Sequence, residues 1–309
     1  MSTTQHRHKI EPLRHQDLRT LRLHRHFRFD STEVGSMLTT NPGASFWIPD
    51  TDELILVGNW RHRPDLHVIH ALVATNNESA LIQQAADHAR QQGATTLLMV
   101  DMNETRRPAF YARHGFRIID RIATYELNEP AALARQFQHV PGLTFARVRP
   151  GDVVAARQVE ELDHLAFPWF WWNVADELET YLNLPDVEVW IGVIDSVVVS
   201  YIGFTNFGGW GHLDRIATHP ERQRAGIGTA SLNMAINLMR DAGAHRIALS
   251  TQGLNLPAQR MYQRRGFFRT PMHDYVVHGI VLDARIDTEQ IDLAQIAVPP
   301  VFSTGERNQ

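Results

Sequence analysis

The chain has 309 residues, a length that accommodates two domains of ordinary size. Its 43% hydrophobic and 21% charged residues are typical of a soluble globular protein, and a net charge of −4 excludes a strong overall attraction to nucleic acid or to an anionic membrane. The absence of cysteine excludes disulfide bonds, thiolate zinc sites and a cysteine nucleophile.

The N-terminal region contains several histidines, namely His6, His8, His15, His24 and His26. Arginines are interleaved with them and no acidic ligand cluster accompanies them, so we predict no metal site and expect a solvated helix through residues 12–29. The chain begins with no apolar core of the signal-peptide kind. Its most apolar run, residues 187–207, contains two acidic residues and a central Asp-Ser turn, which favours a β-hairpin over a membrane span. We therefore expect a cytoplasmic protein.

The first half of the chain predicts several strands and a helix. The helix covers residues 78–92 and ends at Gly93. The predicted strands are residues 46–48, 53–59, 67–73 and 95–100. A Pro-Asp-Thr-Asp turn separates the first two strands.

The second half predicts a similar alternation. Predicted helices cover residues 152–167 and 176–184, and a third runs through Leu232, Ala235, Ile236 and Met239 before Gly243. The predicted strands are residues 143–149, 187–193, 197–207, 211–218, 248–251 and 276–283.

A short motif recurs at the scale of a domain. Tyr-x-x-x-Gly-Phe begins at Tyr111 and again at Tyr262, an offset of 151 residues, each time after a predicted helix and strand. The chain is therefore predicted to contain two copies of one fold, joined within the proline- and alanine-rich residues 128–142. We expect the domains to be residues 1–142 and 143–309.

The turn at residues 219–229, His-Pro-Glu-Arg-Gln-Arg-Ala-Gly-Ile-Gly-Thr, lies between a predicted strand and a predicted helix. Gly226 and Gly228 allow the backbone to come close to a bulky anion. The free N–H groups and the dipole at a helix N-terminus attract a phosphate. Taken alone, Gly-x-Gly before a helix is equally compatible with an ordinary tight turn.

The residues that follow at fixed spacing carry a family resemblance. The pattern Gln/Arg-x-x-Gly-x-Gly/Ala is followed by Asn…Ala…Tyr…Gly-Phe, matched by Gln223, Gly226, Gly228, Asn255, Ala258, Tyr262, Gly266 and Phe267. Together they resemble the GNAT superfamily of N-acetyltransferases, most closely over residues 187–270. The resemblance implies an α/β fold with two tandem domains, each a twisted mixed sheet flanked by helices. It also implies transfer of an acetyl group from acetyl-CoA directly to a primary amine.

The same resemblance implies a set of coenzyme-binding residues. Backbone groups of one strand would bind the pantetheine arm and polarise the thioester carbonyl, and the amides of the glycine turn would hold the pyrophosphate. These residues are Ile216, Ala217, Thr218, Gln223, Arg224, Ala225, Gly226, Ile227, Gly228, Thr229 and Asn255. The arginines of the turn either contact phosphate or are simply solvated.

Tyr262 stands where the family places the acid that meets the leaving thiolate. Because a tyrosine of ordinary pKa (~10) is a weaker acid than a thiol (~8.5), a hydrogen bond to the developing thiolate would be enough.

Two side chains are candidates for the base. His212 and Asp214 are alternate residues of one predicted strand, so we expect them to share the face that includes Ile216 and Thr218. The family commonly uses a carboxylate here, so we favour Asp214, with a salt bridge to a nearby arginine such as Arg215 or Arg246 as the alternative. Second-rank candidates, which more often form the wet face of a helix, are Glu160, Glu161, Asp163 and His164.

Residues 167–173, Phe-Pro-Trp-Phe-Trp-Trp-Asn, contain three tryptophans within four positions. We expect one buried face not to absorb all three. In the superfamily the acceptor enters over this region, so Trp169, Trp171 and Trp172 are candidates for binding an apolar amine or an ammonium group. Docking against residues 1–142 explains their exposure equally well.

The first copy lacks the phosphate-binding features. Its shorter turn, residues 74–80, has neither Gly-x-Gly nor arginine, and Glu78 would repel a pyrophosphate. Tyr111 is retained, but Glu104 stands where the second copy has Asn255. We expect this copy not to bind acetyl-CoA in the usual way and to be non-catalytic.

We expect a small-molecule amine or a peptide N-terminus as acceptor, no nucleic acid or membrane partner, and a monomer or homodimer. Mycothiol synthases, among tandem relatives, have a similar length and a non-catalytic first half, but no motif here fixes their substrate. The competing class is a non-catalytic acetyl-CoA-binding or regulatory protein, and the retention of Tyr262 beside the intact turn favours the enzyme. A nucleotide-binding module is disfavoured because the P-loop lysine and the third Rossmann glycine are missing.

Overall fold

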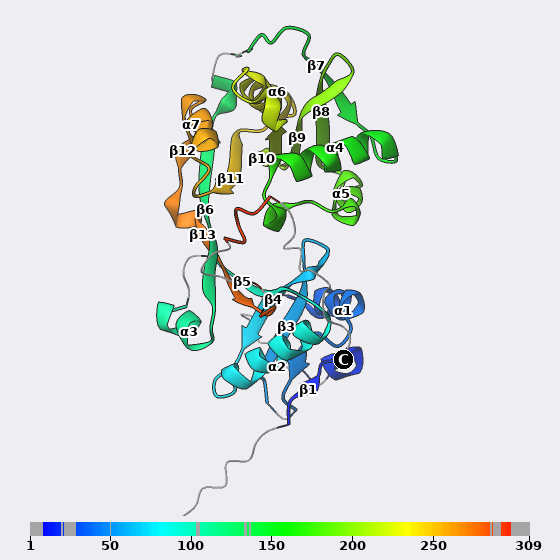
Figure 1. Ribbon diagram of the computed structural model, residues 1–309, viewed down its shortest axis with the longest axis vertical. Coiled ribbons are helices and arrows are strands. Elements are labelled where there is room, and N and C mark those ends of the chain that lie inside the picture. Colours follow the sequence, from blue (N-terminus) through cyan, green and yellow to red (C-terminus); the bar gives the residue numbers. More distant parts are fainter. Residues whose placement is uncertain are drawn as a thin grey trace, which may run out of the picture. The chain divides into compact units, whose positions relative to one another are not determined.

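The computed structural model describes residues 9–19, 21, 29–49, 51–102, 106–132, 135, 137–284, 286 and 292–297. The chain forms two compact units, and each unit is built from two separate segments of the sequence. Unit 1 comprises Met1–Ile119 with Val276–Asp287, and unit 2 comprises Asp120–Tyr275 with Thr288–Gln309. Figure 1 labels most of their helices and strands.

Unit 1 is a mixed sheet whose strand order is β1-β2-β3-β4-β5-β13, with β4 and β5 parallel. Its strands are Glu11–Pro12 (β1), Phe46–Trp47 (β2), Leu54–Trp60 (β3), Arg63–Val73 (β4), Thr96–Met102 (β5) and Tyr275–Val281 (β13). Its helices are His15–Arg19 (η1), Ser31–Thr40 (α1), Glu78–Gln91 (α2) and Pro108–Arg113 (α3). Alternate residues of β3 face opposite ways, so Ile55 and Val57 share a core with α2, and Leu54 and Leu56 share one with α1.

Unit 2 is a second mixed sheet whose strand order is β6-β11-β10-β9-β8-β7, with β12 paired to β6. Its strands are Arg117–Asn128 (β6), Thr144–Val148 (β7), Val187–Ile194 (β8), Val197–Phe207 (β9), Trp210–Thr218 (β10), Arg246–Gln252 (β11) and Phe268–Arg269 (β12). Its α-helices are Val153–Ala166 (α4), Ala175–Leu182 (α5), Ile227–Asp241 (α6) and Leu256–Arg264 (α7). Shorter 3-10 turns are Pro130–Ala132 (η2), Trp169–Trp171 (η3), Pro220–Arg222 (η4) and Pro271–His273 (η5).

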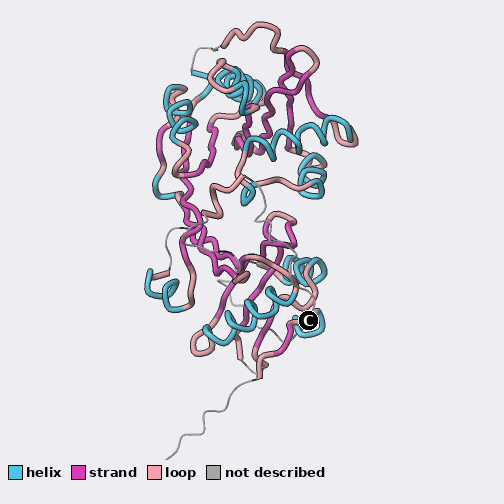
Figure 2. The backbone as a smooth tube through the Cα atoms, viewed as in Figure 1, coloured by secondary structure: helices cyan, strands magenta, loops and turns pink. Residues whose placement is uncertain are grey.

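Helices cover both faces of the unit 2 sheet, as the tube in Figure 2 shows. The core that includes α6 and α7 contains Ile202, Phe204, Leu213, Leu232, Met239, Leu249 and Tyr262. The core that includes α4 and α5 contains Val159, Leu162, Leu178, Val189, Tyr201 and Ala217. The prediction of an α/β fold with two tandem domains, each a mixed sheet flanked by helices, is confirmed.

The compact units do not divide at residue 142, where the sequence predicts the boundary. Residues 120–142 belong to unit 2, and residues 276–287 belong to unit 1. Strand β6 pairs antiparallel with β11 from Asn128↔Arg246 to Ile122↔Gln252. The proline- and alanine-rich composition marks the end of β6, whereas the pairing partner of a strand depends on long-range contacts that composition does not report. The two halves of the sequence have thus exchanged their last strands.

The predicted elements from residue 46 onward match the structure to within a few residues. The predicted helix over residues 12–29 is wrong in its described part, in which Pro12 belongs to β1 and only the 3-10 helix η1, residues 15–19, is helical. Residues 6, 8, 24 and 26 of that histidine-rich region lie outside the described residues. Helix α1 is not among the predicted elements, although its capping box, Asp30 with Glu33, is visible in the sequence.

Across the described residues, no helix combines the length and the apolar character needed to cross a bilayer. Within the same residues, no group of three or more histidine, aspartate or glutamate side chains is arranged to hold a metal ion.

Candidate active site

Two parallel strands separate near the middle of the unit 2 sheet. The printed register of β10 on β11 runs from Trp210↔Arg246 to Leu213↔Leu249 and ends there, whereas β10 stays paired with β9 up to Thr218↔Ser200. Residues 214–218 therefore have one edge that is not paired with β11. Backbone groups on such an edge need hydrogen-bond partners, and an extended ligand can supply them.

A β-bulge marks the point of separation. The register of β10 on β9 shifts between Leu213 and Arg215, so Asp214 is the extra residue. Leu213 and Ile216 both contact the core that includes α6 and α7, although an unbroken strand would place residues three apart on opposite faces.

The bulge corrects the predicted arrangement of the base candidates. His212 and Asp214 do share a face, because Asp214 accepts a hydrogen bond from Tyr181 of α5 on that side. Ile216 lies on the opposite face, so the prediction that it shares their face is wrong. The period of two holds up to the bulge and reverses after it.

Asp214 is a hydrogen-bond hub. Its Oδ1 lies 2.6 Å from Nδ1 of His212, and its Oδ2 accepts from Tyr181 Oη (2.5 Å) and Thr205 Oγ1 (2.7 Å). Since an ionised carboxylate only accepts, this bond places the proton on Nδ1 of His212. The Nε2 atom of His212 has no partner among the described residues, and 46% of the side chain is exposed.

The two arginines predicted as alternative partners of Asp214 are engaged elsewhere, and Arg246 donates from Nε to Glu126 Oε2 at 2.9 Å. Arg215 donates from Nε to Asp163 Oδ2 (2.8 Å) and from Nη2 to Asp163 Oδ1 (3.1 Å). Asp163 is 0% exposed and also accepts from the hydroxyl of Tyr201. The guanidinium carbon of Arg215 lies 3.7 Å from the ring centroid of Phe167. Asp163, assigned to a wet helix face in the sequence, is therefore the centre of a buried network that fixes the end of α4 to β10.

The glycine turn before α6 has the geometry of an anion site. Gly226 has φ 84°, which a residue with a Cβ adopts only under strain, and no side chain caps the helix. A Cβ on Gly228 would lie 3.3 Å from Thr218 Oγ1, so the backbone there lies close to β10. The first N–H groups of α6 have no intrahelical acceptor and remain available to an anion.

A cavity of about 580 Å³ joins the glycine turn, the separated strands and the end of α4. Of the predicted site residues, it is lined by Asp214, Ile216, Ala217, Thr218, Gln223, Arg224, Gly226, Gly228, Thr229, Asn255 and Tyr262. His212, Ala225 and Ile227 are not among the lining residues; Ile227 is buried beneath the turn. Residues that were not predicted as individual site residues also line it, including Phe167, Pro168, Ser250, Thr251, Gln252 and Gln295.

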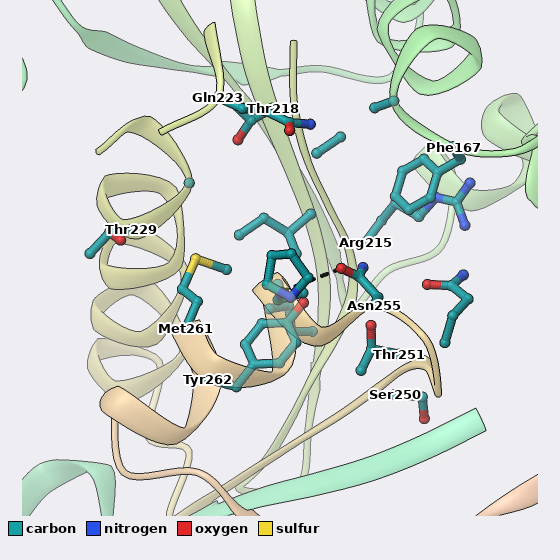
Figure 3. Close-up of a pocket in the computed structure, with 18 of the residues that line it drawn as sticks. Phe167, Arg215, Thr218, Gln223, Thr229, Ser250, Thr251, Asn255, Met261 and Tyr262 are labelled. Atoms are coloured by element: carbon teal, nitrogen blue, oxygen red, sulfur yellow. Dashed lines mark hydrogen bonds between the residues drawn. The ribbon is translucent and has the colours of Figure 1, made fainter. Parts of the chain in front are cut away.

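Tyr262 and Met261, both on α7, lie across the pocket from Phe167 and Arg215 (Figure 3). Burial raises the pKa of Tyr262 above its ordinary value, and the neighbouring Tyr125 adds to the rise. The hydroxyl of Tyr262 is therefore a proton-bearing hydrogen-bond donor at neutral pH. Asn255 caps α7 by accepting the N–H of Ala258 at 3.3 Å, the dashed line in Figure 3.

None of the three predicted acceptor-binding tryptophans lines this pocket. Trp169 and Trp171 are buried, and the indole of Trp171 donates to Asp120 at 2.8 Å. Trp172 stacks on His164 with ring centroids 4.2 Å apart. The expectation that the tryptophans exceed what the core absorbs fails for Trp169 and Trp171, because the η3 turn buries both of them together with Phe170.

The corresponding turn of unit 1 is filled by one of its own side chains. The carboxylate of Glu53 accepts the N–H groups of Thr75 (2.6 Å) and Asn76 (2.7 Å) and the side-chain amide of Asn77 (2.5 Å). Helix α2 begins at the next residue, Glu78. The carboxylate of Glu53 thus occupies in unit 1 the position at which unit 2 has free N–H groups at the start of α6. Residue 104, the counterpart of Asn255, lies outside the described residues.

Comparison with known proteins gives a consistent result. Residues 155–267 match the acetyltransferase (GNAT) family. A GCN5-related N-acetyltransferase from Sphaerobacter thermophilus has a TM-score of 0.61 at 15% identity, covering 90% of this chain and 97% of its own.

Two further solved structures have a similar fold. A tandem GNAT protein from the clavulanic acid biosynthesis pathway gives a TM-score of 0.54 at 16% identity, covering 89% of this chain and 98% of its own. A GCN5-related N-acetyltransferase from Anabaena variabilis gives 0.61 at 11% identity, covering 89% and 73%. At these identities the likeness shows the fold alone. None of the curated proteins matches the chain.

Proposed function

Because residues 155–267 match the GNAT acetyltransferase family and the chain has the fold of tandem GNAT proteins, we propose that this protein moves an acetyl group from acetyl-CoA directly to a primary amine. One observation carries the proposal. A single pocket joins the uncapped N-terminus of α6 to Tyr262 along the edge of β10 that β11 leaves unpaired.

The residues of the pocket fit the coenzyme. The N–H groups at the start of α6, with Gly226 and Gly228 leaving the backbone open, would hold the pyrophosphate. The unpaired edge of residues 214–218 would pair with the pantetheine arm, and Asn255 lines the same pocket. When bound, acetyl-CoA supplies an acetyl group activated as a thioester. Backbone N–H groups on the β10 edge would stabilise the negative charge that develops on the acetyl oxygen.

Tyr262 would assist departure of the thiolate. Its hydroxyl keeps its proton at neutral pH because burial raises its pKa, and it therefore donates a hydrogen bond to the developing sulfur anion. Full proton transfer from Tyr262 to the sulfur is unnecessary, because a thiolate is a weaker base than the tyrosinate that the transfer would leave.

The pair His212–Asp214 would remove the proton from the amine. Asp214 accepts hydrogen bonds from three donors, one of them His212, and so orients the imidazole with its Nε2 left to accept a proton. Because Asp214 lines the pocket and His212 does not, the proton would travel through water. An alkylamine of pKa ~10.4 costs about 4 kcal/mol to deprotonate at pH 7.5, at 1.36 kcal/mol per pH unit, so such an acceptor needs this assistance.

The acceptor would enter beside Ala166, Phe167 and Pro168, which line the pocket at the end of α4. Their apolar character suits an amine with an apolar or aromatic body, either a small molecule or the N-terminal residue of a peptide. Unit 1 is proposed to be non-catalytic, since Glu53 fills the position of a phosphate there.

The proposal is tested by thiol release from acetyl-CoA across a library of alkylamines, aromatic amines and peptide N-termini. We expect release above the hydrolytic background with a subset of amines, together with the acetylated amine as product. Saturable binding of acetyl-CoA without release for any amine would instead support the competing function, a non-catalytic acetyl-CoA-binding protein.

A further inference from the structure

Strand β6 brings a tyrosine from before the predicted domain boundary into the active unit. Within unit 2, β6 lies between β11 and β12, and Tyr125 stands opposite Leu249 on one side and Arg269 on the other. Tyr125 is only 1% exposed. It belongs to the same core as Tyr262, with ring centroids 6.1 Å apart.

The hydroxyl of Tyr125 begins a chain of hydrogen bonds that reaches the wall of the pocket. Tyr125 donates to Oε1 of Gln259, in the first half of α7, at 2.9 Å. The Nε2 of Gln259 donates to the carbonyl of Gln252 (3.1 Å) and to that of Gly253 (2.8 Å), where β11 ends. Because each group has its partner, the arrangement fixes the start of α7 against both β6 and β11.

Tyr262 follows Gln259 by three residues on α7, so the two side chains lie on neighbouring positions of one helix face. Any shift of this helix moves the hydroxyl of Tyr262 relative to the separated strands β10 and β11. Displacements of about 1 Å in a reacting group can cost roughly a hundredfold in rate.

We propose that Tyr125 is a positioning residue for the transfer reaction, which acts through Gln259 to hold the hydroxyl of Tyr262 at the pocket. The inference rests on the proposed acetyl transfer. It also gives the exchanged strand a role in the chemistry, since the hydroxyl that orders the site precedes the second copy of the fold in the sequence.

A double-mutant cycle tests the proposal on the full-length chain. We expect Tyr125→Phe to lower kcat for thiol release about tenfold, with the KM for acetyl-CoA changed by less than about twofold. In a Tyr262→Phe background the same substitution should have no further effect on kcat, because the group that it positions is gone. Gln259→Leu removes the same hydrogen bond from the α7 side and should behave alike.

Tyr111→Phe is the matched control, because it deletes a buried tyrosine hydroxyl that donates to Asp101 at 2.6 Å in unit 1. It should change thermal stability without changing kcat. A normal kcat for Tyr125→Phe, or a loss that adds fully to that of Tyr262→Phe, would overturn the positioning role while leaving acetyl transfer intact. Absence of thiol release by the wild-type protein would overturn acetyl transfer itself. If Tyr125→Phe does not fold, Gln259→Leu carries the same test.

Discussion

Two tyrosines at equivalent positions of the repeat have different surroundings. The hydroxyl of Tyr111 donates to Asp101, whereas that of Tyr262 has no acceptor among the residues that the structure describes and faces the pocket. The residue 151 positions after Asp101 is Gln252, a neutral side chain that also lines the pocket. Unit 1 thus ties the hydroxyl of its tyrosine to a carboxylate, whereas in unit 2 the equivalent tyrosine lines a pocket.

Tyr262→Phe should lower kcat roughly 10- to 1000-fold, because it removes the hydrogen bond to the departing thiolate while keeping the ring in the core. The dissociation constant for acetyl-CoA should stay close to the wild-type value. Steady-state thiol release and titration calorimetry measure the two quantities. A variant with normal kcat would exclude Tyr262 from the chemistry.

Asp214→Asn should move the acid limb of the pH profile of kcat/KM for an alkylamine, because the amide no longer orients His212 as the carboxylate does. The loss in kcat/KM should be roughly 10²- to 10⁴-fold for an alkylamine and smaller for an α-amino acceptor of pKa ~7.7, which needs less help. Asp195→Asn, in the exposed β8–β9 turn, is the control and should leave the profile unchanged. An unaltered acid limb for Asp214→Asn would refute the role of the pair.

Glu53 makes unit 1 sensitive to acid. Burial tends to raise the pKa of this carboxyl, but hydrogen bonds from Asn76, Asn77 and Thr75 outweigh burial and lower it. A lowered pKa in the folded state contributes stability above the unfolded value of about 4.3, and this is lost as pH falls through the folded pKa. Glu53→Gln should therefore lower the free energy of unfolding by about 1–2 kcal/mol at pH 7.

The difference in urea midpoint between wild type and Glu53→Gln should shrink as the pH falls below 4. If the difference is the same at pH 7 and in acid, the carboxylate does not act as the internal anion of this turn.

At the scale of elements, two glycines with similar positive φ angles flank helix α6 but have different neighbours. Gly226 precedes its first turn with φ 84°, and Gly243 follows its last turn with φ 89°. Only Gly226 lines the pocket; a Cβ on Gly243 would have nothing within 4 Å. Substitutions at these two positions therefore distinguish the effect of backbone strain from an effect on ligand binding.

Gly226→Ala and Gly243→Ala should each destabilise the protein by about 1 kcal/mol, since both force an alanine into a left-handed conformation. Only Gly226→Ala should weaken acetyl-CoA binding, by roughly tenfold or more, because the strained turn no longer presents its N–H groups to the pyrophosphate. Thermal melts and calorimetry supply both numbers. Equal effects on binding would remove the turn from the coenzyme site.

The elements themselves were largely predictable from the sequence, and so was the turn at Gly226, because periodicity, caps and spaced glycines are local signals. The bulge at Asp214 was not, since no residue type marks it, and one extra residue reversed the expected faces of β10 beyond it. The prediction that the tryptophans line the site failed for a related reason. Composition reports how much aromatic surface there is, whereas the η3 turn decides where each ring points.

At the scale of the whole molecule, the least predictable feature is the exchange of terminal strands. Strand β6 looks like the end of the first repeat and β13 like the end of the second, yet β6 belongs mainly to unit 2 and β13 mainly to unit 1. The partner of a strand depends on which sheet edge is available to it in the folded chain, and the local sequence of the strand does not specify that edge. Neither repeat is therefore complete as a continuous segment.

A fragment of residues 143–309, cut where the sequence predicts the boundary, should not fold cooperatively. It lacks β6, which contributes Ala123, Tyr125 and Leu127 to the core beneath α6 and α7 and covers the edge of β11. Loss of three buried apolar side chains and an exposed strand edge together exceed the margin by which a domain is stable.

Residues 120–309 form the matched comparison, because this fragment contains every segment of unit 2. It should unfold in a single transition and bind acetyl-CoA with an affinity within a few-fold of the full chain. Strand β13 is present in this fragment but lacks its partner strands from unit 1. Urea unfolding followed by tryptophan fluorescence, with calorimetry for the coenzyme, distinguishes the two fragments. Cooperative folding and coenzyme binding by residues 143–309 would show that β6 is an accessory to unit 2, and the positioning role of Tyr125 would then lose its structural basis.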